Sequence, residues 1–376
     1  MTYGYDDIGI MSAVKTEIEH RPECQVKKDG MLPIFTAPMS SVLNETNAHI
    51  FEENGITPII PRSVEKSIRD ELLGKGKWVA YSLDEFEDFI ETHATIDANT
   101  KILIDVANGH MSKIFTLAKQ AKNKFGENLI LMGGNINNPR AYMEYCLAGF
   151  SYVRVGIGGG CGCLSSTQLG NHVGIATLIY DTYREKALVE KHIYESKLYG
   201  IEPVYPCATK IIADGGIRCY KHVNIALALG ADYVMIGSVL SSLVESSAKT
   251  YYNNDDRKTP IFVDPLSNNT NIRENNGSFI IDKGFGYIEV DTLYKKFYGM
   301  ASVSGQKDLF GKKVRTVEGK EVTLKCTTNI DKWVENMSDY MASAMSYCNI
   351  KDISDFNPKN VTTVLISESE KAAINK

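Results

Sequence analysis

Short apolar runs recur along the chain, and most are followed by a polar or glycine turn and then by a helix-like stretch. The runs cover residues 32–37, 56–60, 78–82, 102–106, 129–132, 152–157, 210–213 and 233–236. Near-continuous apolar runs are typical of strands covered on both faces, as in a parallel sheet. Between them lie amphipathic stretches such as 110–125 and 220–229, with apolar residues at intervals of three and four. This alternation predicts an α/β fold, a (β/α)₈ TIM barrel. An open doubly wound sheet is less favoured because no GxGxxG follows the first strand.

Two segments do not fit the barrel repeat. Residues 248–296 are polar and rich in asparagine, which indicates an inserted lobe that forms a lid or an oligomer contact. Residues 303–325 have the composition of a mobile loop followed by a strand, as expected of a catalytic flap. Beyond them, 331–345 predicts a helix and 361–366 a strand. We therefore expect residues 1–376 to form a single barrel domain with these additions.

Composition and charge narrow the class of protein. The chain has 376 residues, of which 43% are hydrophobic and 23% charged, and a net charge of −5. These values suit a globular protein with a sizeable core, and the absence of a Lys/Arg run argues against nucleic-acid or membrane partners. No signal-like segment or long apolar stretch is present, so we expect a cytoplasmic protein.

The carboxyl ends of the predicted strands carry polar and glycine residues. In α/β barrels these ends form the active site, and the loops after strands seven and eight often bind phosphate. Here those loops read "ADGG" (213–216) and "IGS" (236–238). A carboxylate at Asp214 suits ribose hydroxyls better than a neighbouring phosphate. The ligand expected on this rim is a nucleotide.

A glycine-rich stretch, "VGIGGGCGCLSS" (155–166), follows the sixth strand and carries two thiols. Glycine lets the backbone approach a ligand closely. A thiol on such a loop beside a phosphate pocket has the setting of a nucleophile with a lowered pKa. The other interpretation is a pair of buried space-filling cysteines, and spacing alone does not choose between Cys161 and Cys163. A C-x-C with no second cysteine or histidine pair is a poor zinc site.

Eight motifs are spread over most of the chain: "DDIGI" (6–10), "LPIFTAPMSSV" (32–42), "ILIDVANGH" (102–110), "VRVGIGGGCGC" (153–163), "IIADGGIR" (211–218), "ALALGADYVMIGS" (226–238), "FYGMAS" (297–302) and "VEGKEV" (317–322). In these motifs and in their order the chain resembles the IMP dehydrogenase / GMP reductase family. Members of the family are (β/α)₈ barrels that usually assemble as homotetramers, and the resemblance implies both for this chain.

By position, the resemblance implies three catalytic residues. Cys163 matches the family's nucleophile, Glu318 its proton-donating carboxylate, and Ser165 the hydroxyl that assists proton transfer. Extra residues after Cys163 leave Ser166 or Thr167 as alternative hydroxyls.

The resemblance also implies binding residues. Those matched to the purine nucleotide are Asp214, Gly215, Gly216, Gly237, Ser238, Gly299, Met300, Ala301, Arg315 and Gly319. Those matched to a nicotinamide cofactor, NADPH or NADH, are Arg62, Asp105, Val106 and Ala107. Carbonyls of Gly158, Gly160 and Cys163 match a monovalent-cation site that takes potassium.

Within this family, three features favour a reductase that converts GMP to IMP. "DVANGH" (105–110) and "FYGM" (297–300) resemble the reductase forms, and residues 303–317 lack the Arg-Tyr pair of a dehydrogenase flap. There is also no room between the second and third predicted strands for the paired regulatory CBS domain that many dehydrogenases insert there. An IMP dehydrogenase remains the alternative. Among other classes, a flavin-dependent barrel oxidoreductase would use the same glycine turns.

The catalytic loop departs from the family pattern. Gly159 replaces the usual proline, and Cys161 replaces a phosphate-contacting serine. These changes suggest a divergent member. They leave open a modified purine nucleotide as substrate, or a catalytically inactive homologue that binds nucleotides.

Overall fold

The computed structural model describes residues 1–160, 165–252, 261–267, 270–275, 278–282, 287–312, 316–317 and 319–374. Its centre is an eight-stranded parallel sheet in the order β2-β9-β8-β7-β6-β5-β4-β3. The strands are β2 (Ile34–Thr36), β3 (Ile59–Ile60), β4 (Trp78–Tyr81), β5 (Thr100–Ile104), β6 (Leu129–Ile136), β7 (Tyr152–Val155), β8 (Lys210–Asp214) and β9 (Tyr233–Ile236). A parallel bridge between Phe35 and Thr57 joins β2 to the chain entering β3 and closes the barrel.

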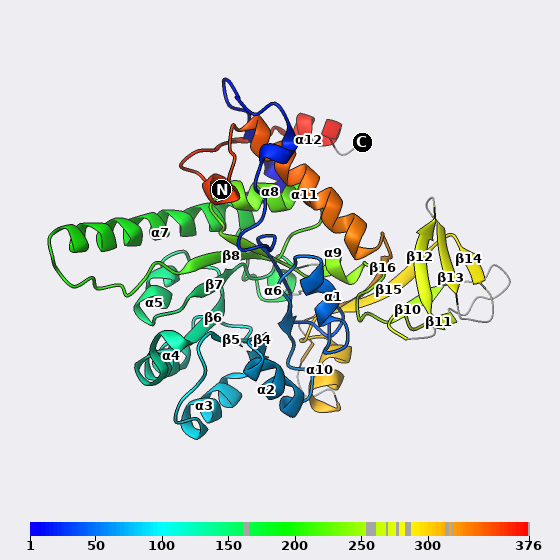
Figure 1. Ribbon diagram of the computed structural model, residues 1–376, viewed down its shortest axis with the longest axis horizontal. Helices are drawn as coiled ribbons and strands as arrows, with labels where there is room; N and C mark the ends of the chain where they lie inside the picture. Colours follow the sequence, from blue (N-terminus) through cyan, green and yellow to red (C-terminus); the bar gives the residue numbers. More distant parts are fainter. Residues whose placement is uncertain are drawn as a thin grey trace.

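Helices surround the barrel, as Figure 1 shows. They are α1 (Ala48–Glu53), α2 (Lys66–Gly74), α3 (Leu83–Thr92), α4 (Ser112–Phe125), α5 (Ala141–Leu147), α7 (Ile175–Leu198), α8 (Tyr220–Ala228) and α11 (Ile330–Tyr347). Two short helices, α6 (Ser165–Gln168) and α9 (Ser238–Ser241), lie in the loops after β7 and β9. The predicted (β/α)₈ barrel is confirmed, and each apolar run overlaps the strand expected of it.

Strand alternation sorts the core into two layers. On β7 and β8, Val153 and Ile211 face the helices and belong to the large outer core. Ile212 points into the barrel and packs with Phe35, Trp78 and other interior residues. Because side chains alternate between the two faces of a strand, residues two apart share the barrel interior. This period of two determines which polar side chains lie inside the barrel at the carboxyl ends of its strands.

The segment predicted as an inserted lobe is built from short antiparallel strands. A four-stranded sheet contains β10 (Thr250–Tyr252), β11 (Ile261–Val263), β15 (Leu293–Tyr298) and β16 (Glu321–Lys325), and a three-stranded sheet contains β12 (Asn271–Asn275), β13 (Ser278–Asp282) and β14 (Tyr287–Val290). Figure 1 shows these strands beside the barrel, next to α9. Buried apolar residues such as Tyr252, Phe279 and Leu293 give the lobe a small core.

The segment expected to begin as a loop at residue 303 instead begins as a helix, α10 (Val303–Phe310). Ser302 caps its N-terminus by accepting a hydrogen bond from the Gly305 amide at 3.0 Å. Gly311 ends it with a positive φ of 69°. A serine before the helix and a glycine after it are local capping signals, so this helix is marked by its ends more than by its polar composition. The strand expected later in the same segment is β16.

The chain ends lie together. β1 (Ile8–Met11) pairs antiparallel with β17 (Thr362–Leu365), and the 3₁₀ helix η1 (Tyr5–Asp7) precedes it. The remaining short elements are η2 (Arg21–Glu23), η3 (Gly126–Asn128), η4 (Ile353–Asp355) and α12 (Glu368–Ile374). Among the described residues, no helix has the length and apolar character needed to cross a membrane.

Candidate active site

A cavity of about 280 Å³ opens at the carboxyl ends of the barrel strands. Many residues assigned by resemblance line it. These are Asp105, Gly160, Asp214, Gly215, Gly216, Gly237, Ser238, Gly299, Met300, Ala301 and Gly319. Other lining residues are Ala37, Pro38, Met39, Asn135, Arg154, Gly159, Ile217, Arg218, Met235 and Phe297. Residues at the ends of six different strands or in the loops after them, together with residues from the lobe, therefore meet at one cavity.

The floor of the cavity is a polar cluster at the top of the barrel interior. Asp105 follows Leu103 by two residues, and Asp214 follows Ile212 by two; both apolar residues lie in the interior core. Arg154 follows Tyr152 on β7 in the same way. The period of two thus brings two acids and one base from neighbouring strands into a single layer.

Hydrogen bonds fix this cluster. Arg154 Nη2 donates to Asp105 Oδ1 at 3.1 Å, and Arg154 Nη1 lies 3.8 Å from Asp214 Oδ2. Asn135 Nδ2 donates to the same Asp214 oxygen at 2.7 Å. Burial raises the pKa of Asp214 and nearby Asp105 adds to the rise, whereas Arg154 and Asn135 oppose it. The fixed carboxylate of Asp214 can accept hydrogen bonds from a ligand's hydroxyl groups.

The turn after β8 forms another wall. Gly215 and Gly216 have φ values of 97° and 77°, a region that side chains disfavour. The loop after β7 lies directly against this turn, since a Cβ on Gly159 would lie 3.6 Å from the Gly216 nitrogen. Gly237 and Ser238 of the β9 loop line the same cavity. Main-chain amides in such glycine turns suit an anionic group.

The lobe strand β15 delivers the opposite wall. After Phe297 the chain passes through Gly299, Met300 and Ala301, all of which line the cavity. The segment is tied to the barrel because Ser41 Oγ donates to the Tyr298 carbonyl at 3.0 Å. The lobe thereby contributes a polar main-chain edge to the cavity.

Some predicted cofactor residues lie beside the cavity without lining it. Arg62 Nη1 donates to the Asp105 carbonyl at 3.3 Å, whereas Val106 and Ala107 follow Asp105 away from the lining. Two guanidinium nitrogens, Arg62 Nε and Arg154 Nε, are buried without a hydrogen-bond partner in the described part of the protein. A buried donor left unpaired is costly. A ligand with a carbonyl acceptor, such as a carboxamide, fits this edge.

Several predicted residues lie outside the described residues: Cys163, Arg315 and Glu318. Ser165 begins α6, but its side chain is also outside the description. Gly158, expected at the cation site, has a φ of 81° and does not line the cavity. The described residues contain no cluster of three or more His, Cys, Asp or Glu side chains that could hold a metal.

Arg154 and Asn135 are site residues that the sequence analysis missed. Arg154 is the single charge in the apolar run "YVRV" and its side chain is 5% exposed. A charge at an interior position of a predicted barrel strand is a signal that could have found it. Asn135 stands in the "GGN" at the end of β6, and its role depends on the distant Asp214.

The fold and the cavity define a (β/α)₈-barrel protein whose polar cavity lies where such barrels carry their active sites. The family model of the IMP dehydrogenase / GMP reductase domain matches residues 5–262. The chain belongs to this family.

Relatives match across nearly the whole chain. A GMP reductase of Streptococcus suis (strain 05ZYH33) is 26% identical over 385 aligned positions, covering 98% of this chain and 96% of the relative. A GMP reductase of Streptococcus pneumoniae serotype 19F (strain G54) is 24% identical, covering 98% and 95%. The resemblance drawn from the sequence motifs is confirmed at the level of the family.

Proposed function

We propose that the protein reduces guanosine monophosphate (GMP) to inosine monophosphate (IMP) and releases ammonia. The observation that carries this proposal is the convergence of Asp214 with the glycine turns of β8 and β9 on one cavity. A fixed carboxylate beside a turn rich in amides matches a ribose next to a phosphate. Membership of the family and the reductase relatives favour this reaction over others on the same fold.

In this proposal the nucleotide lies across the cavity. Its phosphate contacts the amides of Gly215, Gly216, Gly237 and Ser238. Asp214 accepts hydrogen bonds from the ribose hydroxyls. The purine edge meets the main chain of Gly299, Met300 and Ala301, and Gly319 lines the same cavity. Arg315 is assigned to the nucleotide by the family resemblance alone. Positioning of this kind places the purine C2 beside the loop that carries Cys163.

The chemistry is covalent. The Cys163 thiolate forms a bond to C2, and its attack moves an electron pair onto the ring nitrogen. Glu318 and Ser165 pass a proton to the 2-amino group, so the C–N bond breaks and ammonia leaves. Once C2 has received a hydride, which a bound nicotinamide would supply, the C–S bond would break to give IMP and the free thiolate. A covalent intermediate divides one difficult substitution into two easier steps.

The nicotinamide cofactor, when bound, supplies the hydride. Asp105, Arg62 and Arg154 would hold its carboxamide end, because the two unpartnered guanidinium nitrogens need an acceptor. We assign NADPH as this cofactor. Main-chain carbonyls of Gly158, Gly160 and Cys163 would hold a potassium ion, for which carbonyl oxygens are suitable ligands. That ion would order the loop that carries the thiol.

The direct test is incubation of the purified protein with GMP and NADPH. We expect the absorbance of NADPH to fall in step with ammonia release and IMP formation. Cys163→Ala should abolish turnover but retain GMP binding, because the amides and Asp214 remain. Cys161→Ala is the matched control, two residues away on the same loop, and should keep most of the activity.

Other products would contradict the proposal. Xanthosine monophosphate formed from IMP and NAD would identify a dehydrogenase. GMP binding without turnover with either nicotinamide would identify an inactive homologue. Full activity of Cys163→Ala would place the nucleophile elsewhere.

A further inference from the structure

The imidazole of His222 lies behind the β8 turn that lines the cavity. His222 is in the first turn of α8, and its side chain is 3% exposed. Its Nδ1 is 3.1 Å from the Gly216 carbonyl oxygen and 3.2 Å from the Arg218 amide nitrogen. Gly216 and Arg218 both line the cavity. A single side chain that does not line the cavity thus contacts the turn that does.

The N-terminal segment anchors this histidine. Asp6 Oδ1 lies 3.0 Å from His222 Nε2, although the two residues are 216 positions apart in the chain. The neighbouring Tyr5 packs its ring 5.3 Å from the imidazole and also lies against Gly216. The Tyr5 hydroxyl is buried without a described partner. The η1 segment therefore packs against the turn directly through Tyr5, and indirectly through the contact of Asp6 with His222.

The two loop contacts of Nδ1 exclude each other. With a proton, Nδ1 donates to the Gly216 carbonyl; without one, it accepts from the Arg218 amide. Nε2 keeps its proton in both states and donates to Asp6. The charged state makes a charge-assisted hydrogen bond to the turn and places a positive charge behind it. The neutral state loses this charge-assisted bond and the positive charge, and keeps only the hydrogen bond from the Arg218 amide.

We propose that His222 is a positioning residue for the ligand phosphate. The charged imidazole, anchored by Asp6, fixes the Gly216–Arg218 turn in the conformation that binds the phosphate. The inference rests on the proposed function, because it requires a nucleotide phosphate at this turn. If the inference holds, phosphate recognition depends on the buried imidazole of His222 and on the N-terminal segment that contains Asp6.

The charges around His222 favour the charged state. Burial by itself lowers the pKa of His222, but its contacts with Cys219 and Asp6 outweigh burial and leave the pKa raised. Burial raises the pKa of Cys219, yet its contact with His222 leaves it lowered overall. The other groups that face the imidazole are Tyr5, whose pKa is raised by burial, and Lys221, which lies 2.9 Å from Asp6.

The test compares GMP with guanosine, the same nucleoside without the phosphate. Dissociation constants for both are measured by calorimetry on the full-length protein. His222→Asn should bind GMP about tenfold more weakly, the loss of one charge-assisted hydrogen bond, and bind guanosine unchanged. Lys221→Gln is the matched control, because Lys221 contacts Asp6 without touching the turn, and should retain the preference for GMP.

A pH series adds a readout that a purely structural role would not move. Above about pH 7 the phosphate is already a dianion, so its own titration adds little. In the wild type, the preference for GMP over guanosine should fall as pH rises through the raised pKa of His222. The preference in His222→Asn should stay flat. The series is repeated in Cys219→Ser, because the pKa of the neighbouring thiol is lowered by its contact with His222 and its titration must be separated from that of the imidazole.

The outcomes separate the two proposals. An equal preference for GMP in wild type and His222→Asn at every pH would overturn the inference and leave the function standing. A wild type that never prefers GMP over guanosine would overturn both. Thermal unfolding checks that the variant is folded. If it is not, Asp6→Asn and the wild-type pH series decide, since loss of the anchor must lower the preference for GMP.

Discussion

Arg154 pairs with Asp105 at 3.1 Å on the floor of the cavity, and this pair joins the two halves of the proposed site. Asp105 directly follows β5, on the side assigned to the nicotinamide. Through its other terminal nitrogen, Arg154 approaches Asp214 at 3.8 Å, on the side assigned to the ribose. The guanidinium is 5% exposed, so the two carboxylates depend on it for neutralisation.

Removal of the Arg154 charge should destabilise the fold. Arg154→Met leaves two largely buried carboxylates, Asp105 at 15% and Asp214 at 18% exposed, without their cation. Loss of one partner of a buried pair typically costs about 3–5 kcal/mol in the free energy of unfolding. The measurement is urea unfolding at pH 7. Arg184→Met is the matched control. The Arg184 side chain is 70% exposed and its Nη1 comes no closer than 4.0 Å to Asp181 Oδ1, so this substitution should change the stability little. Equal effects of the two substitutions would contradict the role assigned to Arg154.

Asp214→Asn should weaken binding of ribonucleotides. The neutral amide cannot accept two hydroxyl hydrogen bonds as strongly as a carboxylate, so the dissociation constant for GMP should rise at least about tenfold. For 2′-deoxy-GMP, which presents one hydroxyl fewer, the rise should be smaller. Calorimetry with both nucleotides separates the two effects. An equal rise for both would mean that Asp214 does not contact the 2′-hydroxyl.

Local sequence patterns were sufficient for the barrel and for part of the cavity. Apolar runs marked each strand, and polar residues directly after them marked the rim, as at Asp105 and Asp214. These signals are local. The apolar residues that mark a buried strand and the polar residues that mark its carboxyl end are adjacent in the sequence. The contacts of Asp105 and Asp214 with their ligands remain predictions.

Tertiary contacts between distant residues were beyond the same patterns. Asp6 and His222 meet because β1 and α8 pack together, which no spacing in the sequence shows. Lys295 looks like a surface residue of a polar insertion, yet it is 0% exposed. The start of α10 was misjudged because its helix depends on the caps Ser302 and Gly311 more than on an apolar period.

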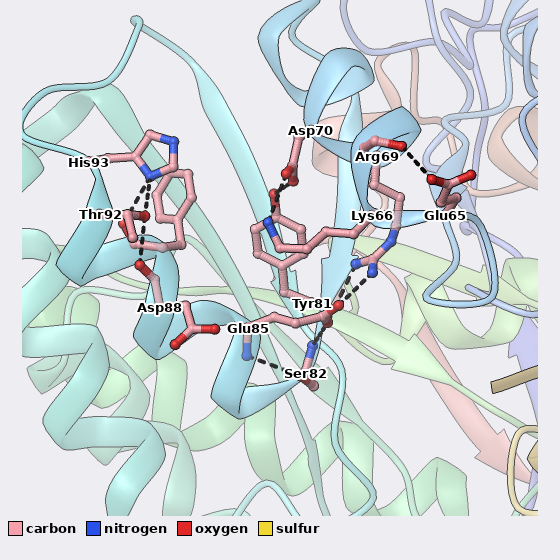
Figure 2. A network of polar contacts seen from close by, with 12 residues as sticks. Glu65, Lys66, Arg69, Asp70, Tyr81, Ser82, Glu85, Asp88, Thr92 and His93 are labelled. Carbon is pink, nitrogen blue, oxygen red and sulfur yellow. Dashed lines mark hydrogen bonds and ion pairs between the residues drawn. The ribbon is translucent and has the colours of Figure 1, made fainter. Parts of the chain in front are cut away.

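A second buried ion pair, between Arg69 and Glu85, holds α2 to the start of α3. Figure 2 shows Arg69 reaching Glu85, with Ser82 beside it. Arg69 Nη2 lies 2.5 Å from Glu85 Oε1, and the Arg69 side chain is 4% exposed. Glu85 also accepts from the Ser82 amide at 2.7 Å, which closes a capping box on α3. Burial raises the pKa of Glu85, but Arg69 and Ser82 leave it lowered overall.

Glu85→Gln should therefore destabilise the protein in a pH-dependent way. A lowered carboxylate pKa contributes stability that is present above the unfolded pKa and is lost as pH falls through the folded pKa. We expect a loss of about 3 kcal/mol at pH 7 that shrinks at acid pH, measured by urea unfolding at several pH values. Glu71→Gln, which breaks the exposed pair with Lys75, is the control and should change nothing measurable. A loss independent of pH would contradict the ion-pair explanation.

Lys295 on β15 is a buried cation that joins the lobe to the barrel. Its Nζ donates to the Val244 carbonyl at 2.8 Å and to the Ser246 carbonyl at 3.4 Å. Burial lowers the pKa of Lys295 to about 8, although the electrostatic interactions with Cys326 and Glu245 act to raise it. The hydrogen bonds to the two carbonyls keep the ammonium in place.

The stability of the protein should rise with pH because of this lysine. Between about pH 8 and the ordinary lysine value near 10.4, the unfolded chain binds more protons than the folded one, so the folded state gains. Lys295→Met removes that gain. The wild type minus variant difference in unfolding free energy should grow by about 2–3 kcal/mol from pH 7 to pH 10. Lys296→Met alters the next residue, which is 38% exposed and bound to Glu321, and should show no such growth. A difference for Lys295→Met that stays constant with pH would mean that the buried lysine keeps its ordinary pKa.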